Sequence, residues 1–271
     1  MPNFQPVIKW SGSKRSQAFA IVSRFPKVFN TYYEPFIGGG SVLYALHPQK
    51  AICGDICSPL IALWDKIKES PLWLAEEYRL RWEHLQREGQ TYFYHVRERF
   101  NESFSAEDML FLSRTCMNGL IRFNSKGQFN SPFHLTRPGI HPARLKTILE
   151  EWSSKIQSAS FYTKDYTELL TIAKVGDLAY LDPPYLNTSS IYSGKLNFNR
   201  FLEVLEELNK KDVMWVLSFN GVRGDKSYVV ELPKELYKKH ELINSGQSSF
   251  NRLIDQKKTI VQESLYRNFE S

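Results

Sequence analysis

Residues 182–185 read Asp-Pro-Pro-Tyr and directly follow the apolar run 175–181. An apolar run stopped by two prolines predicts a buried strand that ends abruptly at the carboxyl edge of a sheet, where ligands of open α/β sheets bind. The carboxylate of Asp182 and the carbonyl of Pro183 are two acceptors for one amino group, and Tyr185 offers an aromatic face to a planar ring. This chemistry suits the exocyclic amine of a nucleobase, whereas the structural alternative is a proline turn with a core tyrosine.

A second constellation follows the first expected strand, residues 31–36. Residues 38–40 are three glycines at the start of a helix, where glycine lets the backbone approach a ligand closely and the helix N-terminus offers free N–H groups. Asp55 ends the next expected strand, 51–55, in a position from which a carboxylate can bind both hydroxyls of a ribose. The pattern predicts a nucleoside-binding site, and a glycine turn that serves packing alone is the alternative.

The glycine spacing narrows the choice of nucleoside cofactor. It does not complete the dinucleotide fingerprint, and no second phosphate-binding device is evident. This favours S-adenosyl-L-methionine, which has no phosphates, over a nicotinamide cofactor. The basic segment 9–15, Lys-Trp-Ser-Gly-Ser-Lys-Arg, carries two lysines that could reach a methionine carboxylate or a phosphate, although a solvated basic turn fits it equally well.

The elements that must position these groups alternate between strand and helix, which predicts a parallel α/β sheet. Strands are expected at residues 31–36, 51–55, 160–162, 177–181, 213–218 and 259–266, with helices from Ser58, from Pro142 and over 198–210. The segment 60–140 differs, because it reads as helices at 71–88, 91–100 and 109–117, the last behind a capping box at 105–108, followed by a hairpin or loop at 119–134. We expect an insertion there, and polar loops that could cover a site at 187–197 and 220–226.

The composition is that of a globular protein and weakly favours a polyanionic partner, with a basic surface over a well-filled aromatic core as the alternative. The 271-residue chain carries 35 Lys and Arg against 29 Asp and Glu, a net charge of +6, and 14% aromatic residues, many beside basic ones, as stacking and phosphate contact together require. Three cysteines without a secretory signal favour a reducing, cytoplasmic location. No Cys/His set at ligand spacing and no apolar run near the ~20 residues of a membrane span is present, so neither a metal nor a membrane is expected.

Taken together, these motifs resemble those of the Dam-type DNA adenine-N6 methyltransferases, the α-group or D12 class. The resemblance lies in residues 9–14, 34–42, 161–166 and 182–185, with Asp55 in the place of the family's ribose-binding acid. It implies an α/β fold with a Rossmann-like S-adenosylmethionine-dependent methyltransferase sheet, and the catalytic residues Asp182, Pro183, Pro184 and Tyr185. It also implies the cofactor-binding residues Trp10, Lys14, Pro35, Phe36, Gly38, Gly39, Gly40, Ser41, Asp55, Phe161, Asp165, Tyr166 and Asp182.

The likeness extends into the insertion. Segments 117–124 and 127–133 resemble the family's DNA-reading hairpin, which implies Arg122 bidentate on a guanine, the contact that geometry favours most. The resemblance implies the DNA-binding residues Asn118, Leu120, Arg122, Asn124, Lys126, Pro132 and Arg137. The expected domains are therefore a catalytic methyltransferase domain, 1–59 with 141–271, and a mostly helical target-recognition domain, 60–140, that contains the hairpin.

The activity expected from the resemblance is site-specific transfer of a methyl group to the exocyclic N6 of adenine in a short duplex DNA sequence. The target base is flipped out of the duplex and methylated by direct in-line transfer. The expected partner is double-stranded DNA, with a restriction endonuclease on a separate chain acting on the same site as a further partner, and the expected state is a monomer. A GATC-like site is implied, but Met117 and His134 depart from the family pattern, which leaves the recognised sequence open.

Three other functions compete with this one. Methylation of cytosine N4 uses the same tetrapeptide chemistry, although such enzymes usually carry Ser in the place of Asp182. A structured RNA could be the substrate instead of duplex DNA. The chain could also be a catalytically silent DNA-binding protein that keeps the fold as a scaffold.

Overall fold

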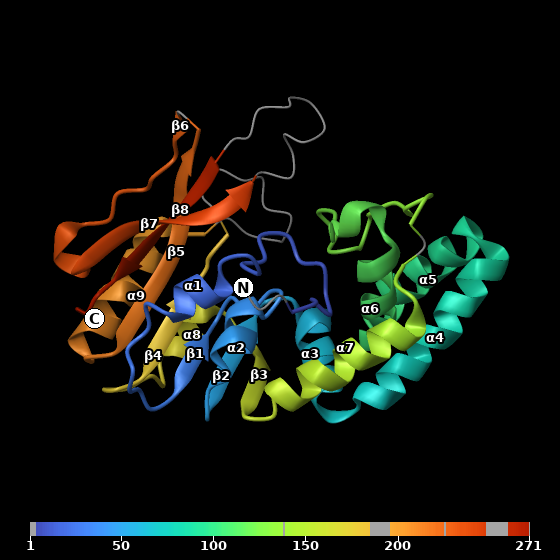
Figure 1. Ribbon diagram of the computed structural model, residues 1–271, viewed down its shortest axis with the longest axis horizontal. Coiled ribbons are helices and arrows are strands. Elements are labelled where there is room, and N and C mark those ends of the chain that lie inside the picture. The colour runs from blue at the N-terminus through green and yellow to red at the C-terminus, as the bar shows by residue number, and fades with distance from the viewer. Residues whose placement is uncertain (1–3, 138, 185–195, 225, 248–259, 271) are drawn as a thin grey trace.

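The computed structural model describes residues 4–137, 139–184, 196–224, 226–247 and 260–270. Its centre is an eight-stranded sheet with the order β3-β2-β1-β4-β5-β8-β7, and β6 pairs with β5 (Figure 1). The strands are β1 (Tyr32–Glu34), β2 (Ala51–Asp55), β3 (Ala159–Thr163), β4 (Leu178–Leu181), β5 (Met214–Arg223), β6 (Lys226–Ser227), β7 (Lys239–Gln247) and β8 (Ile260–Arg267). Strands β1 to β5 pair in parallel, whereas β8 runs antiparallel to both β5 and β7. This is the Rossmann-like α/β sheet that the sequence predicts.

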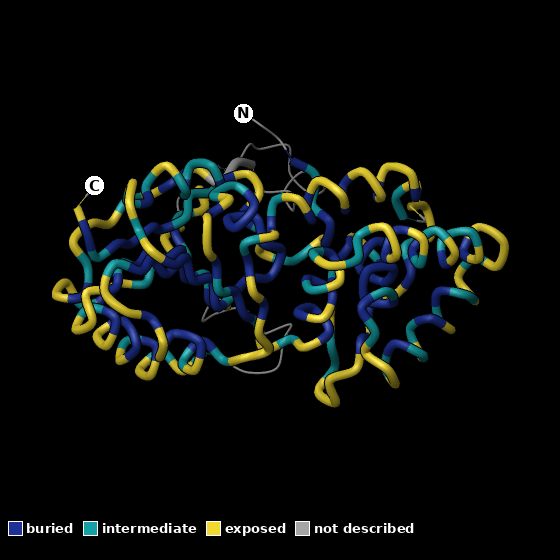
Figure 2. The backbone as a smooth tube through the Cα atoms, turned by 90° about the horizontal axis from the view of Figure 1, so that it is seen from below, coloured by how far each residue is buried: buried dark blue, intermediate teal, exposed yellow. Residues whose placement is uncertain are grey.

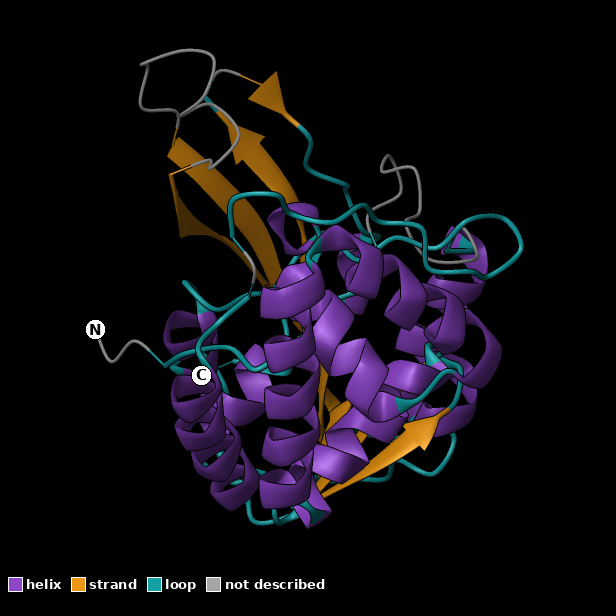
Figure 3. Cartoon of the chain, turned by 90° about the vertical axis from the view of Figure 1, so that its right-hand side faces the viewer, coloured by secondary structure: helices purple, strands orange, loops and turns teal. Residues whose placement is uncertain are grey.

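Helices cover both faces of the sheet, because its strands are apolar on both sides. One face carries α1 (Ala18–Val22), α2 (Ser41–Leu46) and α3 (Ser58–Glu69), and the other carries α8 (Tyr166–Leu170) and α9 (Phe198–Lys210) (Figure 1). In Figure 3 some of the strands project beyond the helices. Helix α9 buries Phe201, Val204, Leu205 and Leu208, the spacing of one helical face.

Alternation along the strands divides the core into two layers. Tyr32 and Tyr180 belong to the apolar cluster on the α1–α3 face, whereas their neighbours Tyr33 and Leu181 belong to the cluster under α8 and α9. Side chains along a strand alternate between the two faces with a period of two. Glu34 is two residues beyond Tyr32 and Asp182 is two residues beyond Tyr180, so both carboxyl groups point to the α1–α3 face.

The segment after α3 builds a helical part beside the sheet (Figure 1). It comprises α4 (Pro71–Glu88), α5 (Gln90–Ser103), α6 (Ala106–Thr115), the 3-10 turn η1 (Met117–Gly119) and, after the hairpin segment, α7 (Pro142–Lys155); a second 3-10 turn, η2 (Lys234–Leu236), lies before β7. The buried carboxylate of Asp108 joins three of these helices. Arg81 Nε donates to it at 2.6 Å and Arg99 Nε at 2.8 Å. Although burial alone would raise the pKa of Asp108, these guanidinium groups hold it below its ordinary value.

The helical part and the sheet share one continuous apolar core. Trp64 of α3 and Trp152 of α7 pack with ring centroids 5.2 Å apart, and their cluster runs from the sheet to Phe100 of α5. In Figure 2 the buried segments accordingly continue from one part into the other. The predicted domain boundary at residue 60 falls inside α3, whose side chains contact both β3 and α6, so the split into two domains remains a prediction.

Several expectations about local structure are wrong. Residues 220–223 do not form a loop but extend β5, and β6 pairs back onto them at Val222 and Arg223; the loop expected at 187–195 lies outside the described residues. The edge strand β7 was not predicted, because its sequence is too polar to show a strand pattern. The expected capping box is not formed, because the side chain of Ser105 makes no capping bond to α6 and the carboxylate of Asp108 is bound by two arginines.

Candidate active site

The carboxyl ends of β1, β2 and β4 meet at one edge of the sheet. The chain leaves β1 towards β2 and β3 on one side, while β4 and β5 lie on the other, so the strand order reverses between β1 and β4. Open α/β sheets bind ligands at such a point. Three carboxyl groups end these strands: Glu34 on β1, Asp55 on β2, and Asp182 directly after β4.

Asp182 is paired with Lys14. The Lys14 Nζ atom lies 2.8 Å from Asp182 Oδ1, and the side chains are only 5% and 18% exposed. Burial raises the pKa of Asp182 to about 6, because the effect of Lys14, which lowers it, does not outweigh desolvation. The group is thus an ionisable acceptor near neutral pH, as expected of a functional carboxylate.

Lys14 has carboxylate partners within the protein that the sequence did not predict. It was assigned to the cofactor, but the ammonium is buried between Asp182 and Glu263 Oε2, 3.5 Å away, and also donates to the Gly12 carbonyl. The reason is the shared face: Lys14 precedes α1, which packs on the face towards which Asp182 points. A role for Lys14 in cofactor binding remains a prediction.

Glu34 is a buried carboxyl group that the sequence did not single out. It is 3% exposed, and the Tyr32 hydroxyl donates to its Oε2 at 2.8 Å. Burial raises the pKa of Glu34 to about 8, and the nearby charge of Asp182 also raises it, whereas the hydrogen bond from Tyr32 lowers it. Glu34 is therefore mostly protonated at neutral pH, and the signal that could have found it is an acidic residue at the end of an otherwise apolar strand.

The glycine turn packs against the N-terminal segment and the core tryptophans. A Cβ atom on Gly38 would lie 2.7 Å from Cδ1 of Trp10, and one on Gly40 would lie 2.9 Å from Trp64. Gly40 also has φ 63°, in the left-handed region that favours glycine. Packing alone therefore requires these glycines, and the contacts predicted between the turn and a ligand remain a prediction.

Two side-chain interactions fasten this turn. Ser41 and Ser13 hydroxyls are 2.8 Å apart, which joins the turn to the N-terminal segment. Asp55 Oδ2 accepts from the Gly38 N–H at 3.3 Å, and its Oδ1 accepts from the Cys57 N–H at 3.0 Å. Burial raises the pKa of Asp55 to about 6 despite these bonds. The structure thus brings together the predicted residues Trp10, Ser41 and Asp55.

The predicted cofactor residues beyond β3 have structural partners. Phe161 is buried and stacks on Trp64 at 6.0 Å, so its ring is part of the core. Asp165 caps α8, since its Oδ1 accepts from the Thr167 N–H at 2.9 Å. Tyr166 stacks on Phe36 with ring centroids 5.2 Å apart, which places these two predicted residues together.

The tetrapeptide is described as far as Pro184, and Tyr185 lies outside the described residues. The Pro183 carbonyl accepts no hydrogen bond from any described residue. The role of this carbonyl as a second acceptor beside Asp182 remains a prediction.

The hairpin segment projects above α5 and α6 (Figure 1). Its two arms are joined by antiparallel bridges at Cys116–Phe133 and Phe123–Phe129. Asn101 of α5 fixes the second arm, because its Oδ1 accepts from the Phe129 N–H at 2.7 Å and its Nδ2 donates to the Phe129 carbonyl at 3.1 Å.

The predicted DNA-binding residues differ in the exposure of their side chains and in their hydrogen bonds. Leu120 is half-buried, and those with exposed side chains are Asn118, Arg122, Lys126, Pro132 and Arg137. Asn124 is instead a turn former: its Oδ1 accepts from the backbone N–H groups of Lys126 at 2.9 Å and Gln128 at 3.0 Å. A DNA contact by Asn124 remains a prediction.

Lys9 places a positive charge beside the hairpin, which was not predicted from the sequence. It is exposed and lies against the hairpin, where a Cβ atom on Gly119 would be 2.7 Å from Cβ of Lys9. Burial of its stem lowers the pKa of Lys9, as do the charges of Arg114 and Arg137. The N-terminal segment therefore contacts the hairpin at Lys9 as well as the sheet edge at Lys14.

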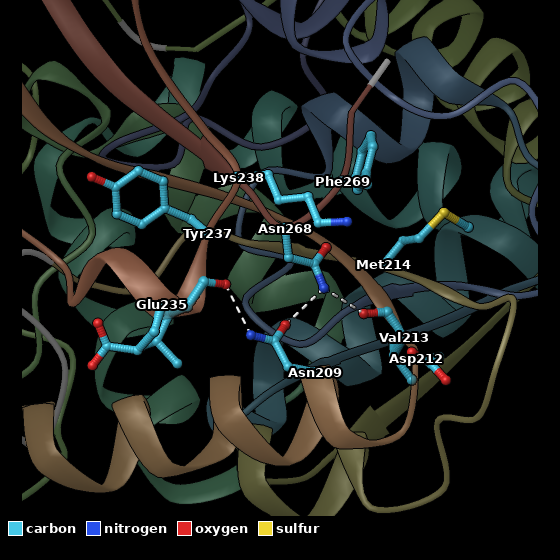
Figure 4. Close-up of a pocket in the computed structure, with 10 residues that line it drawn as sticks. Asn209, Asp212, Val213, Met214, Glu235, Tyr237, Lys238, Asn268 and Phe269 are labelled. Atoms are coloured by element: carbon cyan, nitrogen blue, oxygen red, sulfur yellow. Dashed lines mark hydrogen bonds between the residues drawn. The ribbon is translucent and has the colours of Figure 1, made fainter.

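A pocket of about 380 Å³ lies at the amino end of β5, away from the edge that carries Asp182. Figure 4 shows the two asparagines at its base, Asn209 and Asn268. Asn209 donates to the Leu236 carbonyl at 2.9 Å, and Asn268 donates to Asn209 Oδ1 at 2.8 Å and to the Val213 carbonyl at 2.9 Å. These polar groups already bond to one another, so they hold β5 to its neighbours and call for no ligand.

Among the described residues, no group of three or more His, Cys, Asp or Glu is arranged to hold a metal ion, and the three cysteines are unpaired. None of the helices in the described ranges has the length and apolar character that a bilayer crossing requires.

Comparisons with known proteins agree with the motifs. The model of the D12 class N6 adenine-specific DNA methyltransferase family matches residues 10–254. The chain is 32% identical over 196 residues to Type II methyltransferase M1.LlaDCHI of Lactococcus lactis subsp. cremoris, which covers 69% of this chain and 68% of that protein. It is 29% identical over 300 aligned residues to Type II methyltransferase M.MjaIII of Methanocaldococcus jannaschii, with 98% and 99% covered. It is 32% identical over 190 residues to the DNA adenine methylase of Escherichia coli strain K12, with 68% and 66% covered.

Proposed function

This chain belongs to the D12 class N6 adenine-specific DNA methyltransferase family, and we propose that it methylates N6 of adenine within one short sequence of duplex DNA, with S-adenosyl-L-methionine as the methyl donor. The observation that carries the proposal is the Asp182 carboxylate, which is largely buried and directly follows β4 where the strand order of the sheet reverses. We assign the Pro183 carbonyl as the second acceptor, so that the pair would match the two N–H bonds of an exocyclic amine.

The chemistry assigned to these acceptors follows from the target. N6 of adenine is a weak nucleophile, because its lone pair is delocalised into the ring. Hydrogen bonds from N6 to Asp182 and to the Pro183 carbonyl draw the nitrogen towards tetrahedral geometry and localise that pair. Positioning and the exclusion of water supply the remaining catalysis. Asp182 need not be a strong base, since the proton leaves most readily once methylation has made N6 cationic.

The residues around the switch point fit the cofactor. Asp55 is a half-buried carboxylate at the end of β2, where a pair of ribose hydroxyls can bind. Phe36 and Tyr166 supply stacked aromatic surface, and the turn at residues 38–40 offers backbone beside Asp55, which accepts from the Gly38 N–H. Bound there, S-adenosyl-L-methionine supplies an electrophilic methyl group to the amine that Asp182 and Pro183 hold.

The hairpin and its surroundings are proposed to bind the duplex. Exposed Arg122 is suited to a bidentate contact with guanine, and the exposed bases Lys126 and Arg137 to phosphate contacts. Asn118 and Leu120 would lie near the target base, which is flipped into the site at a cost of about a few kcal/mol. We assign target recognition to residues 60–140 and catalysis to the remainder.

The biological setting is part of the proposal. Two of the relatives are Type II methyltransferases, which favours a restriction endonuclease on a separate chain that cuts the same site. A GATC-like sequence, a cytoplasmic location and a monomeric enzyme complete the proposed setting.

The test is single-molecule sequencing of modified bases on plasmid DNA from cells that lack adenine methylation and express this chain. We expect N6-methyladenine in one short repeated context, and none when the cells express Asp182→Ala, a variant that should still bind DNA. An absence of adenine signal, or a cytosine N4 signal, would contradict the proposal and point to an RNA substrate or to the other base.

A further inference from the structure

A second carboxylate, Glu263 of β8, lies at the Lys14–Asp182 ion pair of the proposed site. Its Oε2 is 3.5 Å from Lys14 Nζ, and its side chain is 17% exposed. The ammonium is therefore shared between Asp182, at 2.8 Å, and Glu263. Because all three groups are largely removed from solvent, their interactions are weakly screened.

The sheet is built to place Glu263 there. It shares a strand face with Leu265, which belongs to the core cluster on the α1–α3 side, so alternation directs it towards Lys14. The neighbouring strand β5 is irregular opposite it, because its register with β8 shifts between Phe219, which pairs with Ser264, and Val222, which pairs with Gln262. Strand β7 pairs regularly with Glu263 through Ile243 and shifts its register just beyond, between Asn244 and Gly246. Such irregularities re-aim side chains and are common beside active sites.

Gly221 shows how close the strands come at this irregularity. A Cβ atom on Gly221 would lie 2.7 Å from Cα of Glu263, which is closer than any real side chain could be. The residue at 221 must therefore be glycine for β8 to bring Glu263 to Lys14.

We propose that Glu263 is a positioning residue that holds Lys14 between two carboxylates, so that Asp182 can release the ammonium when it accepts a hydrogen bond from the target amine. The inference rests on the proposed function, in which Asp182 is that acceptor. When Asp182 turns to the amine, Lys14 keeps Glu263 as its counter-ion, and a buried cation is not left unpaired. A buried charge that loses its partner is strongly destabilising.

The charges around Asp182 determine how removal of the Glu263 charge should change Asp182 as a hydrogen-bond acceptor. The groups that face it are Lys14 from the N-terminal segment, Glu34 of β1, Tyr180 of β4 and Glu263 of β8. Burial contributes most to the raised pKa of Asp182, and Glu263 raises it further. Without the Glu263 charge, Lys14 and Asp182 form an isolated, tighter pair, and Asp182 becomes a weaker acceptor.

The test is Glu263→Gln, which keeps the shape and removes the charge. Single-turnover methylation is measured at saturating S-adenosyl-L-methionine, from pH 5 to pH 8, on a duplex that carries the sequence identified on plasmid DNA. We expect a plateau rate about ten- to a hundredfold lower, with the acidic fall of the rate moved to lower pH and with unchanged dissociation constants for DNA and cofactor. Glu263→Asp should restore part of the rate.

A matched control lies one strand away. Glu241 of β7 contacts Arg24 and Arg267 at 3.5 and 3.7 Å and not Lys14, so Glu241→Gln should leave both the rate and its pH profile unchanged. The inference is overturned if Glu263→Gln behaves like this control, or if it loses cofactor or DNA affinity in proportion to its rate. A wild-type enzyme that produces no N6-methyladenine would instead overturn the proposed function itself.

Discussion

The Nζ atom of Lys14 lies 2.8 Å from Oδ1 of Asp182, so the proposed acceptor of the target amine is occupied by a cation from the N-terminal segment. A substrate amine must therefore compete with this ammonium or share the carboxylate with it. The protonation of Asp182 should therefore affect the rate of the proposed reaction, and it can be varied by changing the pH.

The first prediction concerns pH. Burial raises the pKa of Asp182 to about 6, and only the ionised carboxylate accepts hydrogen bonds without also donating one. The single-turnover rate should be full at pH 7–8 and fall as the pH is lowered through about 6. The pH dependence of methylation checks this, with Asp182→Asn as the inactive reference. A rate that stays constant down to pH 4.5 would exclude Asp182 as the titrating group.

The second prediction concerns the cofactor. Asp55→Asn replaces the carboxylate that accepts from Gly38 and Cys57 and that we assign to the ribose hydroxyls. Hydrogen bonds to a charged group contribute about 1.5–3 kcal/mol, so calorimetry should show at least a tenfold weaker affinity for S-adenosyl-L-methionine. Sequence preference should not change. Unaltered cofactor affinity in a folded variant would place the ribose elsewhere.

The third prediction separates base contacts from phosphate contacts. Arg122→Ala should cost ~1–3 kcal/mol of discrimination at one guanine position. Lys126→Ala, at the exposed tip of the same hairpin, should weaken binding to all sequences alike and reduce the salt dependence of the affinity. Binding titrations on matched and single-mismatch duplexes at two salt concentrations distinguish the two. If Arg122→Ala weakened every duplex equally, Arg122 would be a phosphate contact.

The fourth prediction concerns stability. Burial raises the pKa of Glu34 to about 8 from 4.5, so between these pH values the folded state holds a proton that the unfolded state has released. The free energy of unfolding should therefore fall as the pH rises through this window. Glu34→Gln keeps an acceptor for Tyr32 and does not titrate, so this part of the fall, on the order of 1–3 kcal/mol, should vanish. Denaturant unfolding at pH 5 and pH 8 measures it, and parallel losses in both proteins would refute the assignment.

Much of the site could be predicted because its parts are contiguous in sequence. The tetrapeptide at 182–185, the glycines at 38–40 and Asp55 each combine a strand end with a distinctive local pattern, and the fold does bring these strand ends to one edge. The family comparison confirms the type of enzyme that those patterns indicated.

The other parts of the site and the fold could not be predicted, because they depend on contacts between segments that are distant in the sequence. Glu34 and Glu263 reach the site because alternation along β1 and β8 turns them to the face that also carries Lys14, and no local pattern reveals which residues share a face across a sheet. The edge strand β7 was missed for a related reason, since its polar residues are stabilised by pairing with β8. The turn that the Asn124 side chain closes, by accepting from the N–H groups of Lys126 and Gln128, was not predicted either.

The N-terminal segment 9–14 has a mechanical consequence. Lys9 rests on the hairpin at Gly119, Trp10 covers Gly38, and Lys14 holds Asp182. The N-terminal segment 9–14 thus contacts the proposed sites for DNA, cofactor and target base. A contact between DNA and Lys9 would therefore act on the same continuous backbone that carries Lys14 to the proposed acceptor.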